Sequence, residues 1–342
     1  MSGMLPRLFT TTGGRTALFL TGLTLLASAV VVRRQTKRAE TENPPTGRFL
    51  DIDGVHLHVV ERGTGDPIIL LHGNGSLIQD FALAGVIDGL AESHRVIAFD
   101  RPGFGYTDRP KGRIWNADAQ AELIHAAMHA LDINAAVVVG HSWGTMVATA
   151  LALAHPESVK RLVLISGYYF PTPRLDVPLA AVPAIPGIGT VLRHTLSPLI
   201  GRAMWPALCR VLFSPADVTP GFRQWPVWMT LRPEQLRASA ADTAMMIPQA
   251  IHMADRYGEL KMPVTVLAGD GDLIVNTAVQ SVQLQERLLH GTLQVVPGAG
   301  HMLHHISPAI VIAANKGQAG TGNPAVPMQT TSSGHNTVTT FN

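Results

Sequence analysis

Gly140-His141-Ser142-Trp143-Gly144 is the stretch that decides the fold of this chain. An apolar run at 135–139 precedes it, and an alanine-rich stretch at 145–154 follows it. The pattern Gly-x-Ser-x-Gly between two such segments predicts a buried strand that turns sharply into a helix, with Ser142 exposed at the tip. In so tight a turn, side chains two positions before and after the serine would collide, which explains Gly140 and Gly144.

Two backbone N–H groups are expected to face Ser142 and to bind an oxyanion. The amide of Trp143 lies at the N-terminus of the predicted helix, where it points toward a developing negative charge. A second apolar run, 67–71, ends in the loop His72-Gly73-Asn74-Gly75, and the backbone of Asn74 is the other expected donor. The alternative is an ordinary strand-to-helix turn, which glycines also favour.

Two carboxylates and a histidine follow later strands. The run 264–268 ends in Gly269-Asp270-Gly271-Asp272, and we expect Asp272 to orient a histidine while Asp270 shapes the turn. The alternative makes both of them turn formers. After the run 292–296 and a glycine turn comes His301, the expected general base. Since one imidazole is enough, His304 and His305 are expected on a helix surface.

The order Ser142, Asp272, His301 resembles that of the α/β-hydrolase superfamily, in which nucleophile, acid and histidine follow one another along the chain. The resemblance covers roughly residues 48–316. It implies an α/β fold: a mostly parallel, doubly wound sheet with an inserted helical lid. The segment 99–107 of this chain also looks like a turn found in that family, which braces the loop beside the active site. One departure is Thr145, where many relatives have a third glycine; it affects helix packing only.

The chain is therefore divided as follows. The predicted segments are a flank (1–15), a membrane anchor or signal segment (16–32), a linker (33–48), the hydrolase core (49–167 and 256–316), a helical cap (168–255) and a disordered tail (317–342). Within the core we expect a hairpin over 49–60 with Asp53-Gly54 at its turn, further strands at 67–71, 95–99, 135–140, 160–166, 264–268 and 292–296, and helices at 78–92, 116–131 and 143–155.

The N-terminal segment 16–32 is uncharged and mostly apolar, at the lower length limit for a membrane-spanning helix. A single anchor is the favoured interpretation. Cleavage of a secretion signal at Ala27-Ser28-Ala29 is the alternative, and the basic residues that follow argue against it. Residues 1–50 hold seven of the 26 Lys and Arg side chains but only two of the 24 Asp and Glu side chains, so the remainder is mildly acidic. No nucleic-acid partner is expected.

No cofactor and no metal ion are expected. The single cysteine excludes an internal disulfide, and the sequence contains neither a phosphate-binding glycine loop nor His-Glu-x-x-His. The cap segment, rich in aromatic and methionine side chains and broken by prolines, predicts short helices and an apolar pocket for a small-molecule substrate. The oligomeric state is not determined by these patterns.

These residues predict a serine hydrolase acting on an ester or related acyl substrate with an apolar body. Two other reactions stay open on the same triad: hydrolysis of a carbon–carbon bond in diketone-like ring-cleavage products, and perhydrolysis. Dehalogenation and epoxide hydrolysis are disfavoured, because relatives with those activities use an aspartate where this chain has Ser142. A protein that binds a ligand on the same fold with little turnover is the alternative outside enzymes.

Overall fold

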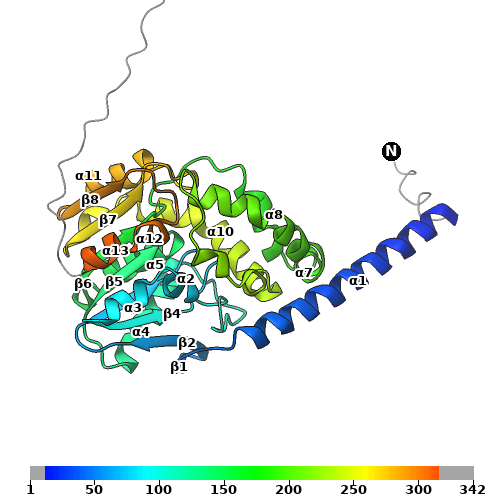
Figure 1. The fold of residues 1–342 in the computed structure, drawn as a ribbon, viewed down its shortest axis with the longest axis horizontal. Coiled ribbons are helices and arrows are strands. Elements are labelled where there is room, and N and C mark those ends of the chain that lie inside the picture. Colours follow the sequence, from blue (N-terminus) through cyan, green and yellow to red (C-terminus); the bar gives the residue numbers. More distant parts are fainter. Residues whose placement is uncertain (1–11, 316–342) are drawn as a thin grey trace, which may run out of the picture.

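Eight strands form one sheet in the order β1-β2-β4-β3-β5-β6-β7-β8. They are seen in a computed structural model that describes residues 12–315 (Figure 1). The pairs β1–β2 and β2–β4 are antiparallel and all others are parallel. The strands are β1 Arg48–Ile52, β2 Val55–Arg62, β3 Pro67–Leu71, β4 Arg95–Phe99, β5 Ala136–His141, β6 Val159–Ile165, β7 Val264–Gly269 and β8 Gly291–Val296.

Helices cover both faces of the sheet, which is why its central strands are apolar on every residue rather than on alternate ones. Along β3, Ile69 and Leu71 pack into the cluster under α4 and α5, while Ile68 and Leu70 pack into the cluster under α2, α3 and α13. The expected doubly wound α/β architecture is confirmed. These helices are α2 Gln79–Leu83, α3 Val86–Ala91, α4 Ala117–Ala130, α5 Trp143–Ala154, α11 Gln283–Arg287, α12 Leu303–Ile306 and α13 Pro308–Asn315.

A helical insertion follows β6 and precedes β7. Its helices are α6 Val177–Ala181, α7 Ile188–His194, α8 Leu196–Phe213, α9 Val227–Thr230 and α10 Pro233–Met253. Several of its large apolar residues, among them Phe213, Phe222 and Met229, are fully or nearly fully buried in a cluster that also includes Leu77 and Met302 of the core. Prolines do not end every helix there, since Pro206 and Pro248 lie inside α8 and α10.

The structure corrects two sequence-based predictions. The single helix expected over 78–92 is two helices, because Gly85 adopts a left-handed conformation (φ 72°) that an α-helix cannot contain. The linker expected over 33–48 is helical as far as Glu42, as part of α1 (Thr12–Glu42). Lys, Arg, Gln, Ala and Glu favour a helix, so residues 33–42 continue the apolar helix. The predicted tail, 317–342, and residues 1–11 of the predicted flank lie outside the described residues.

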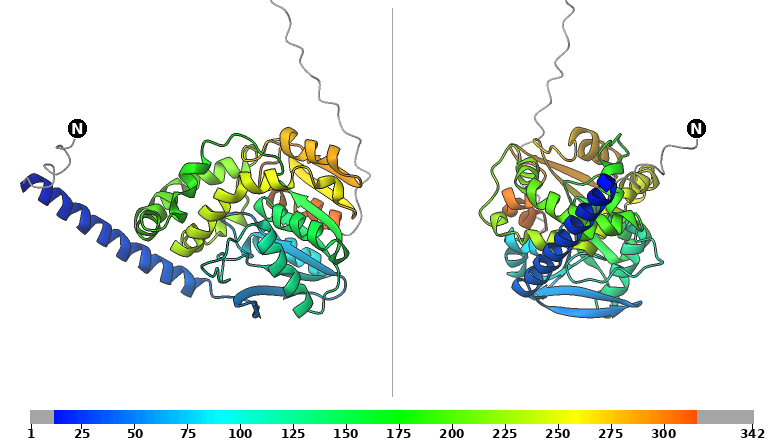
Figure 2. Two further views of the ribbon diagram at one scale, coloured as in Figure 1. Left: turned by 180° about the vertical axis from the view of Figure 1, so that it is seen from behind. Right: turned by 90° about the vertical axis from the view of Figure 1, so that its right-hand side faces the viewer.

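Helix α1 leaves the body beside the insertion. Its N-terminal half projects away from the rest of the chain, and its C-terminal half lies against α7, α8 and α9 (Figures 1 and 2). Val32 and Ala39 are the α1 side chains that this packing buries. The anchor-like helix and the insertion therefore form one side of the molecule, and the sheet forms the other.

Parallel strands bring their carboxyl ends to one edge of a sheet, where sites in α/β proteins gather. Four loops with polar residues leave that edge here: 72–75 after β3, Ser142 after β5, 270–275 after β7 and 297–301 after β8. Their side chains meet because β3 is paired with β5 and β7 with β8.

Gly144→Ala tests how closely α5 must approach β3. A Cβ at this position would lie 2.2 Å from the carbonyl oxygen of Leu71. We expect the free energy of unfolding to fall by about 1–3 kcal/mol or more, the usual cost of overpacking, as measured by urea denaturation of the full chain in detergent. Gly258→Ala is the control, because its added methyl meets nothing nearer than 3.8 Å. Equal stability of the two variants would contradict the argument.

Candidate active site

Ser142, His301 and Asp272 form a hydrogen-bonded line across the edge of the sheet. The Nε2 atom of His301 lies 3.0 Å from the hydroxyl of Ser142, and its Nδ1 atom lies 2.8 Å from Oδ2 of Asp272. An ionised carboxylate can only accept a hydrogen bond, so Nδ1 carries the proton and Nε2 is left to accept the serine proton. This is the geometry that activates a serine as a nucleophile.

Asp272 and Asp270 have separate partners. Besides His301, Asp272 accepts the backbone N–H groups of Ile274 and Val275 through Oδ1, at 2.8 and 2.9 Å. These bonds fix the carboxylate while Oδ2 faces the imidazole. Asp270 is exposed, and its Oδ1 accepts the N–H of Gly298 at 2.7 Å, which ties the turn after β7 to the turn after β8. The structure thus brings Asp272, and not Asp270, against His301.

Ser142 has the backbone angles of a strained turn, with φ 51° and ψ −120°. A positive φ is energetically costly for a residue that has a side chain, and it persists only where the surrounding structure holds the residue in place. The glycines on either side make the turn possible: a Cβ on Gly140 would lie 2.6 Å from the carbonyl oxygen of Gly144. The strain leaves the serine hydroxyl free of the helix that begins at Trp143.

The loop after β3 is held by a buried arginine. Arg101, fully buried, donates from Nε to the carbonyl of His72 at 2.8 Å and from a terminal nitrogen to the carbonyl of Gly73 at 3.0 Å. The carbonyl of Gly73 and the N–H of Asn74 belong to one trans peptide and point in opposite directions. Arg101 therefore turns the Asn74 N–H away from itself.

This loop runs against the serine. A Cβ added to Gly73 would lie 3.1 Å from Cβ of Ser142. Among residues 12–315 the backbone N–H of Asn74 has no hydrogen-bond partner, and that of Trp143, the first residue of α5, has no acceptor within its helix. Both amides are thus free to bind a ligand beside Ser142, as the sequence predicts.

Helix α10 is fastened to the same loops and forms a fixed wall. The side-chain amide of Asn74 donates to the carbonyl of Ser239 and to the hydroxyl of Thr243. The indole of Trp143 donates to the carbonyl of Asp242 at 3.0 Å. The carboxylate of Asp242 is paired with Arg101 at 2.7 Å and with Arg109 at 2.9 Å. The segment 99–107, expected to brace the site, does so through Arg101.

A buried polar cluster lies behind His301. His141 donates from Nε2 to the backbone carbonyl of His301 at 3.1 Å, so it helps to fix the backbone of that residue. Asp80 is fully buried beside it, and its carboxylate accepts hydrogen bonds from His305 at 2.7 Å and from Ser76 at 2.9 Å. Nothing in the sequence pattern singles out Asp80 or gives His141 a role, because their partners lie far apart along the chain.

The expectation that His304 and His305 lie on a helix surface is wrong. Both are buried in α12, and the Nε2 atoms of both lie close to Oδ1 of Asp80, at 3.0 Å for His304 and 2.7 Å for His305. Burial alone would raise the pKa of Asp80, but the two histidines outweigh it and hold that pKa well below its usual value. Burial lowers the pKa of His304 and, with the help of His304 and His301, that of His141.

One set of buried residues has the donors that could hold a metal ion. The ligand atoms of Asp80, His141 and His304 lie within 4.8 Å of one another. One oxygen of Asp80, however, already accepts a short hydrogen bond from His305. A second, more exposed set consists of Glu122, His125 and His155.

The chain resembles known hydrolases in part of its sequence. Residues 66–200 match the model of a family described as alpha/beta hydrolase fold. A 2-hydroxymuconate semialdehyde hydrolase of Pseudomonas sp. strain CF600 is 38% identical over 136 residues, which are 39% of this chain and 48% of that protein. The chain spans about half the length of such curated relatives. A 2-(acetamidomethylene)succinate hydrolase of Mesorhizobium japonicum is 28% identical over 278 residues, 78% of this chain and 92% of that protein.

The fold is shared more widely. A thermophilic esterase from Thermogutta terrifontis superposes with a TM-score of 0.65 at 23% identity, over 79% of this chain and 97% of that chain. The overall fold thus recurs in a protein that has little sequence in common with this chain.

The buried histidines predict a loss of stability in mild acid. Burial, together with the nearby charge of Arg101, lowers the pKa of His72 to about 4, and the pKa values of His141 and His304 are lowered as well. Below pH 6.5 the unfolded chain binds protons at these positions that the folded chain does not, so folding weakens as the pH falls from 6.5 toward 4. His58, whose pKa is raised by Asp100 against the effect of burial, acts in the opposite direction.

Urea denaturation at pH 7 and at pH 4.5 measures this effect. Four lowered histidine pKa values, that of His125 included, against the one raised value of His58 predict a smaller free energy of unfolding at pH 4.5. A constant or larger value there would contradict the assignment of neutral, buried histidines.

Proposed function

We propose that this chain is a serine hydrolase of the α/β-hydrolase superfamily, acting on an ester or a related acyl substrate with an apolar body. The observation that carries the proposal is the hydrogen-bonded line from Ser142 through His301 to Asp272. A ligand-binding protein on this fold would have no need of all three groups in this order.

In the proposed reaction, His301 takes the proton of Ser142 as the serine oxygen attacks the substrate carbonyl. Asp272 keeps the proton of His301 on Nδ1 and stabilises the imidazolium that forms. The amides of Asn74 and Trp143 donate to the oxyanion, an interaction worth roughly 3–4 kcal/mol for each donor. His301 then gives this proton to the departing alcohol oxygen, which leaves an acyl-enzyme. Water attacks the acyl-enzyme with the neutral His301 as general base, and its proton returns to Ser142 as the acid is released.

The surroundings of the serine support an apolar substrate. On the adjacent wall, Arg101 and Arg109 both pair with the carboxylate of Asp242, so these three side chains carry one net positive charge but neither cation lacks a partner. Such a site offers little to a highly charged substrate, while the insertion supplies partly buried apolar side chains, including Met245 and Met246.

Carbon–carbon bond hydrolysis is the second candidate. It is favoured by the relative of Pseudomonas sp. strain CF600, whose name states that it hydrolyses 2-hydroxymuconate semialdehyde and which is 38% identical over 136 residues. The same nucleophile, base and oxyanion donors could serve that reaction. Perhydrolysis is a further reaction of such triads, with no observation here that favours it.

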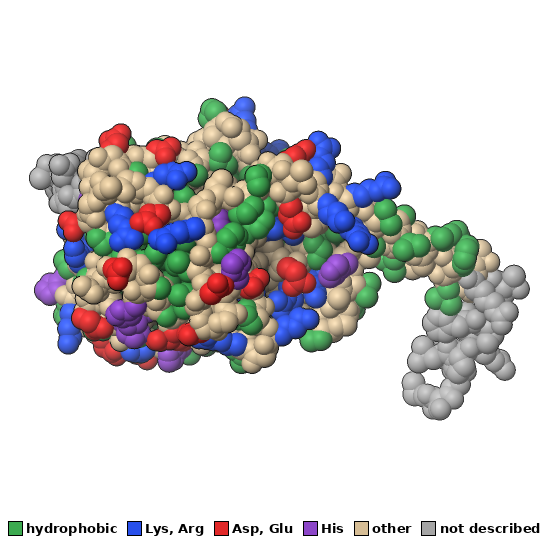
Figure 3. All heavy atoms as spheres, turned by 90° about the horizontal axis from the view of Figure 1, so that it is seen from below, with side chains coloured by type: hydrophobic (Ala, Val, Ile, Leu, Met, Phe, Trp, Pro, Cys, Tyr) green, Lys and Arg blue, Asp and Glu red, His purple; other side chains and the backbone are tan. Residues whose placement is uncertain are grey.

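We also propose that α1 anchors the protein in a membrane. Thr16–Glu42 is a helix of 27 residues that is long and apolar enough to cross a bilayer, and only 11% of its most apolar window is buried. Large apolar side chains such as Leu18, Phe19 and Leu26 are exposed on it, which is costly in water. Figure 3 shows hydrophobic side chains along the projecting part of the helix. Removal of the helix as a signal segment is the alternative.

Labelling with a fluorophosphonate probe tests the triad. The full chain in detergent is expected to react once, at Ser142, and Ser142→Ala and His301→Ala are expected not to react. Asp272→Asn should lower kcat for an ester by about 10⁴-fold, because the wrong imidazole tautomer then faces the serine.

Asp270→Asn is the matched control, since this carboxylate lies in the same turn but binds Gly298 rather than His301. It is expected to leave labelling and kcat unchanged. Full reactivity of Asp272→Asn, or a loss in Asp270→Asn as large as in Asp272→Asn, would refute the assignment of the acid.

The two candidate reactions can be separated with two substrates. We expect kcat/KM for a p-nitrophenyl ester of a medium-chain acid to exceed that for 2-hydroxymuconate semialdehyde by at least tenfold, because the wall beside the serine has no unpaired cation for the carboxylate of the latter. Absorbance assays measure both. The opposite ranking would replace ester hydrolysis by carbon–carbon bond hydrolysis as the function.

A further inference from the structure

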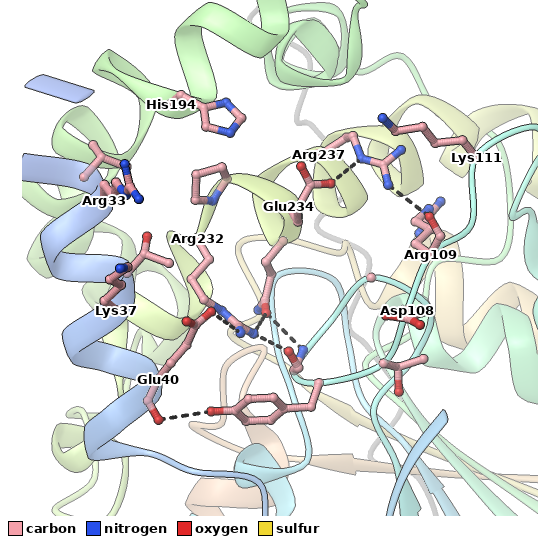
Figure 4. A pocket seen from close by; sticks show the side chains of 18 of the residues that line it. Arg33, Lys37, Glu40, Asp108, Arg109, Lys111, His194, Arg232, Glu234 and Arg237 are labelled. Atoms are coloured by element: carbon pink, nitrogen blue, oxygen red, sulfur yellow. Dashed lines mark hydrogen bonds and ion pairs between the residues drawn. The ribbon is translucent and has the colours of Figure 1, made fainter. Parts of the chain in front are cut away.

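A large cavity lies where α1 meets the body, away from the catalytic serine. Its volume is about 930 Å³, and it is lined by α1 residues from Ala29 to Glu40, by the loop 103–111 and by the start of α10 at 232–237. In Figure 4, Arg33 and Lys37 lie on α1 at one side, and Arg109 and Lys111 lie on the loop at the other. The volume is that of a typical small-molecule site.

The lining is strongly basic. Six Lys and Arg side chains face three carboxylates, so the cavity carries an excess of positive charge. Three of the cations have acidic partners: Arg232 lies 3.3 Å from Glu40, Arg237 lies 2.9 Å from Glu234, and Arg109 lies 2.9 Å from Asp242. The other three cations are Arg33 and Lys37, one turn apart on α1, and Lys111 on the facing loop. They form no ion pair within the part of the chain that the structure describes.

The cavity begins where the apolar part of α1 ends. Ala29 and Val32 line it next to Arg33, and the exposed apolar side chains of α1 lie on the N-terminal side of this point, as far as Val31. Helix α7 contacts α1 and exposes Ile188 and Val191, with 61% and 50% of their surfaces free. Figure 3 shows Lys and Arg side chains where α1 joins the body and hydrophobic ones beyond them.

We propose that this cavity binds the phosphate headgroup of an anionic phospholipid. The unpaired cations Arg33 and Lys37 contact the phosphate, Lys111 adds positive charge from the other side of the cavity, and the acyl chains run along the apolar part of α1 and the exposed face of α7. Basic pockets at the level where a helix leaves a membrane suit such headgroups. The proposal rests on the membrane anchor proposed above, but not on the reaction of Ser142.

A lipid accounts for both the basic part and the apolar part of this surface, whereas a free phosphate or nucleotide accounts only for the basic part. The cations account for the anionic group. The apolar side chains beside them, which no described part of the chain covers, account for a ligand with hydrocarbon chains. We therefore commit to a phospholipid, with inorganic phosphate as the competing source of the same chemistry.

Native mass spectrometry of the full chain in a neutral detergent tests this proposal. Dioleoyl phosphatidylglycerol is expected to bind one molecule per chain, at least tenfold more tightly than dioleoyl phosphatidylcholine, and millimolar inorganic phosphate is not expected to displace it. Absence of preference for the anionic lipid, or displacement by phosphate, would overturn the proposal.

Matched double variants locate the site. Arg33→Ala with Lys37→Ala removes two cations that line the cavity and is expected to weaken phosphatidylglycerol binding at least tenfold. Arg34→Ala with Arg38→Ala removes the same charge from the same turns of α1, but neither residue lines this cavity, and Arg38 has an exposed partner in Glu42. It is expected to change binding less than twofold. Equal losses in the two pairs would show general attraction to charge and would overturn the site.

Two further readouts separate this proposal from the others. Retention of the full chain in membranes washed with alkaline carbonate reports the anchor, and fluorophosphonate labelling reports Ser142. If both hold in every variant and phosphatidylglycerol still shows no preferred binding, the lipid site alone is wrong.

Discussion

Arg101 carries a positive charge with no exposure to solvent, and the neighbourhood of the candidate active site depends on how that charge is compensated. A buried charge without a partner would cost several kcal/mol. Asp242 supplies the opposite charge from α10, and the carbonyls of His72 and Gly73 and the side-chain carbonyl of Gln120 accept further hydrogen bonds. One side chain thus joins the loop after β3 to a helix of the insertion. Because it also sets the direction of the Asn74 amide, the packing of α10 and the geometry around Ser142 are linked.

The buried cluster around Asp80 supports the other side of the site. His305 and Ser76 hold the Asp80 carboxylate, and His141 holds the backbone of His301. In a low-dielectric interior, hydrogen bonds of this kind are strong and their loss is costly. His301 therefore has fixed neighbours both at its imidazole and at its backbone. Such support is what keeps a nucleophile and its base within hydrogen-bonding distance.

Helix α1 packs against the helical insertion. The C-terminal half of α1 buries Val32 and Ala39 against the insertion, and Glu40 pairs with Arg232 at the start of α10. Since α10 is also the wall beside Ser142, the helix proposed to enter a membrane is only one helix away from the reacting groups. This arrangement suits a hydrolase whose apolar substrate comes from, or remains near, a lipid surface.

The sequence alone determined the sheet and the order of the reacting groups. The strands 67–71 and 95–99 are predicted to the residue, and 136–141, 159–165 and 264–269 nearly so, because buried parallel strands are continuous apolar runs that glycine and aspartate turns interrupt. The turn around Ser142 is also determined by local sequence, because Gly140 and Gly144 avoid a steric collision within five consecutive residues. Asp272 and His301 follow from their places after strands, although their roles remain predictions.

Only the tertiary structure decided what lies around them. Arg101 and Asp242, His141 and His301, and Asp80 and His305 are pairs whose members lie 141, 160 and 225 positions apart along the chain, and no sequence periodicity records such pairs. For the same reason His304 and His305 could be mistaken for surface residues, and the continuation of α1 through 33–42 could be mistaken for a linker. Local sequence fixes backbone conformation and the burial of apolar runs. The compensation of buried charge is settled only when distant segments pack together.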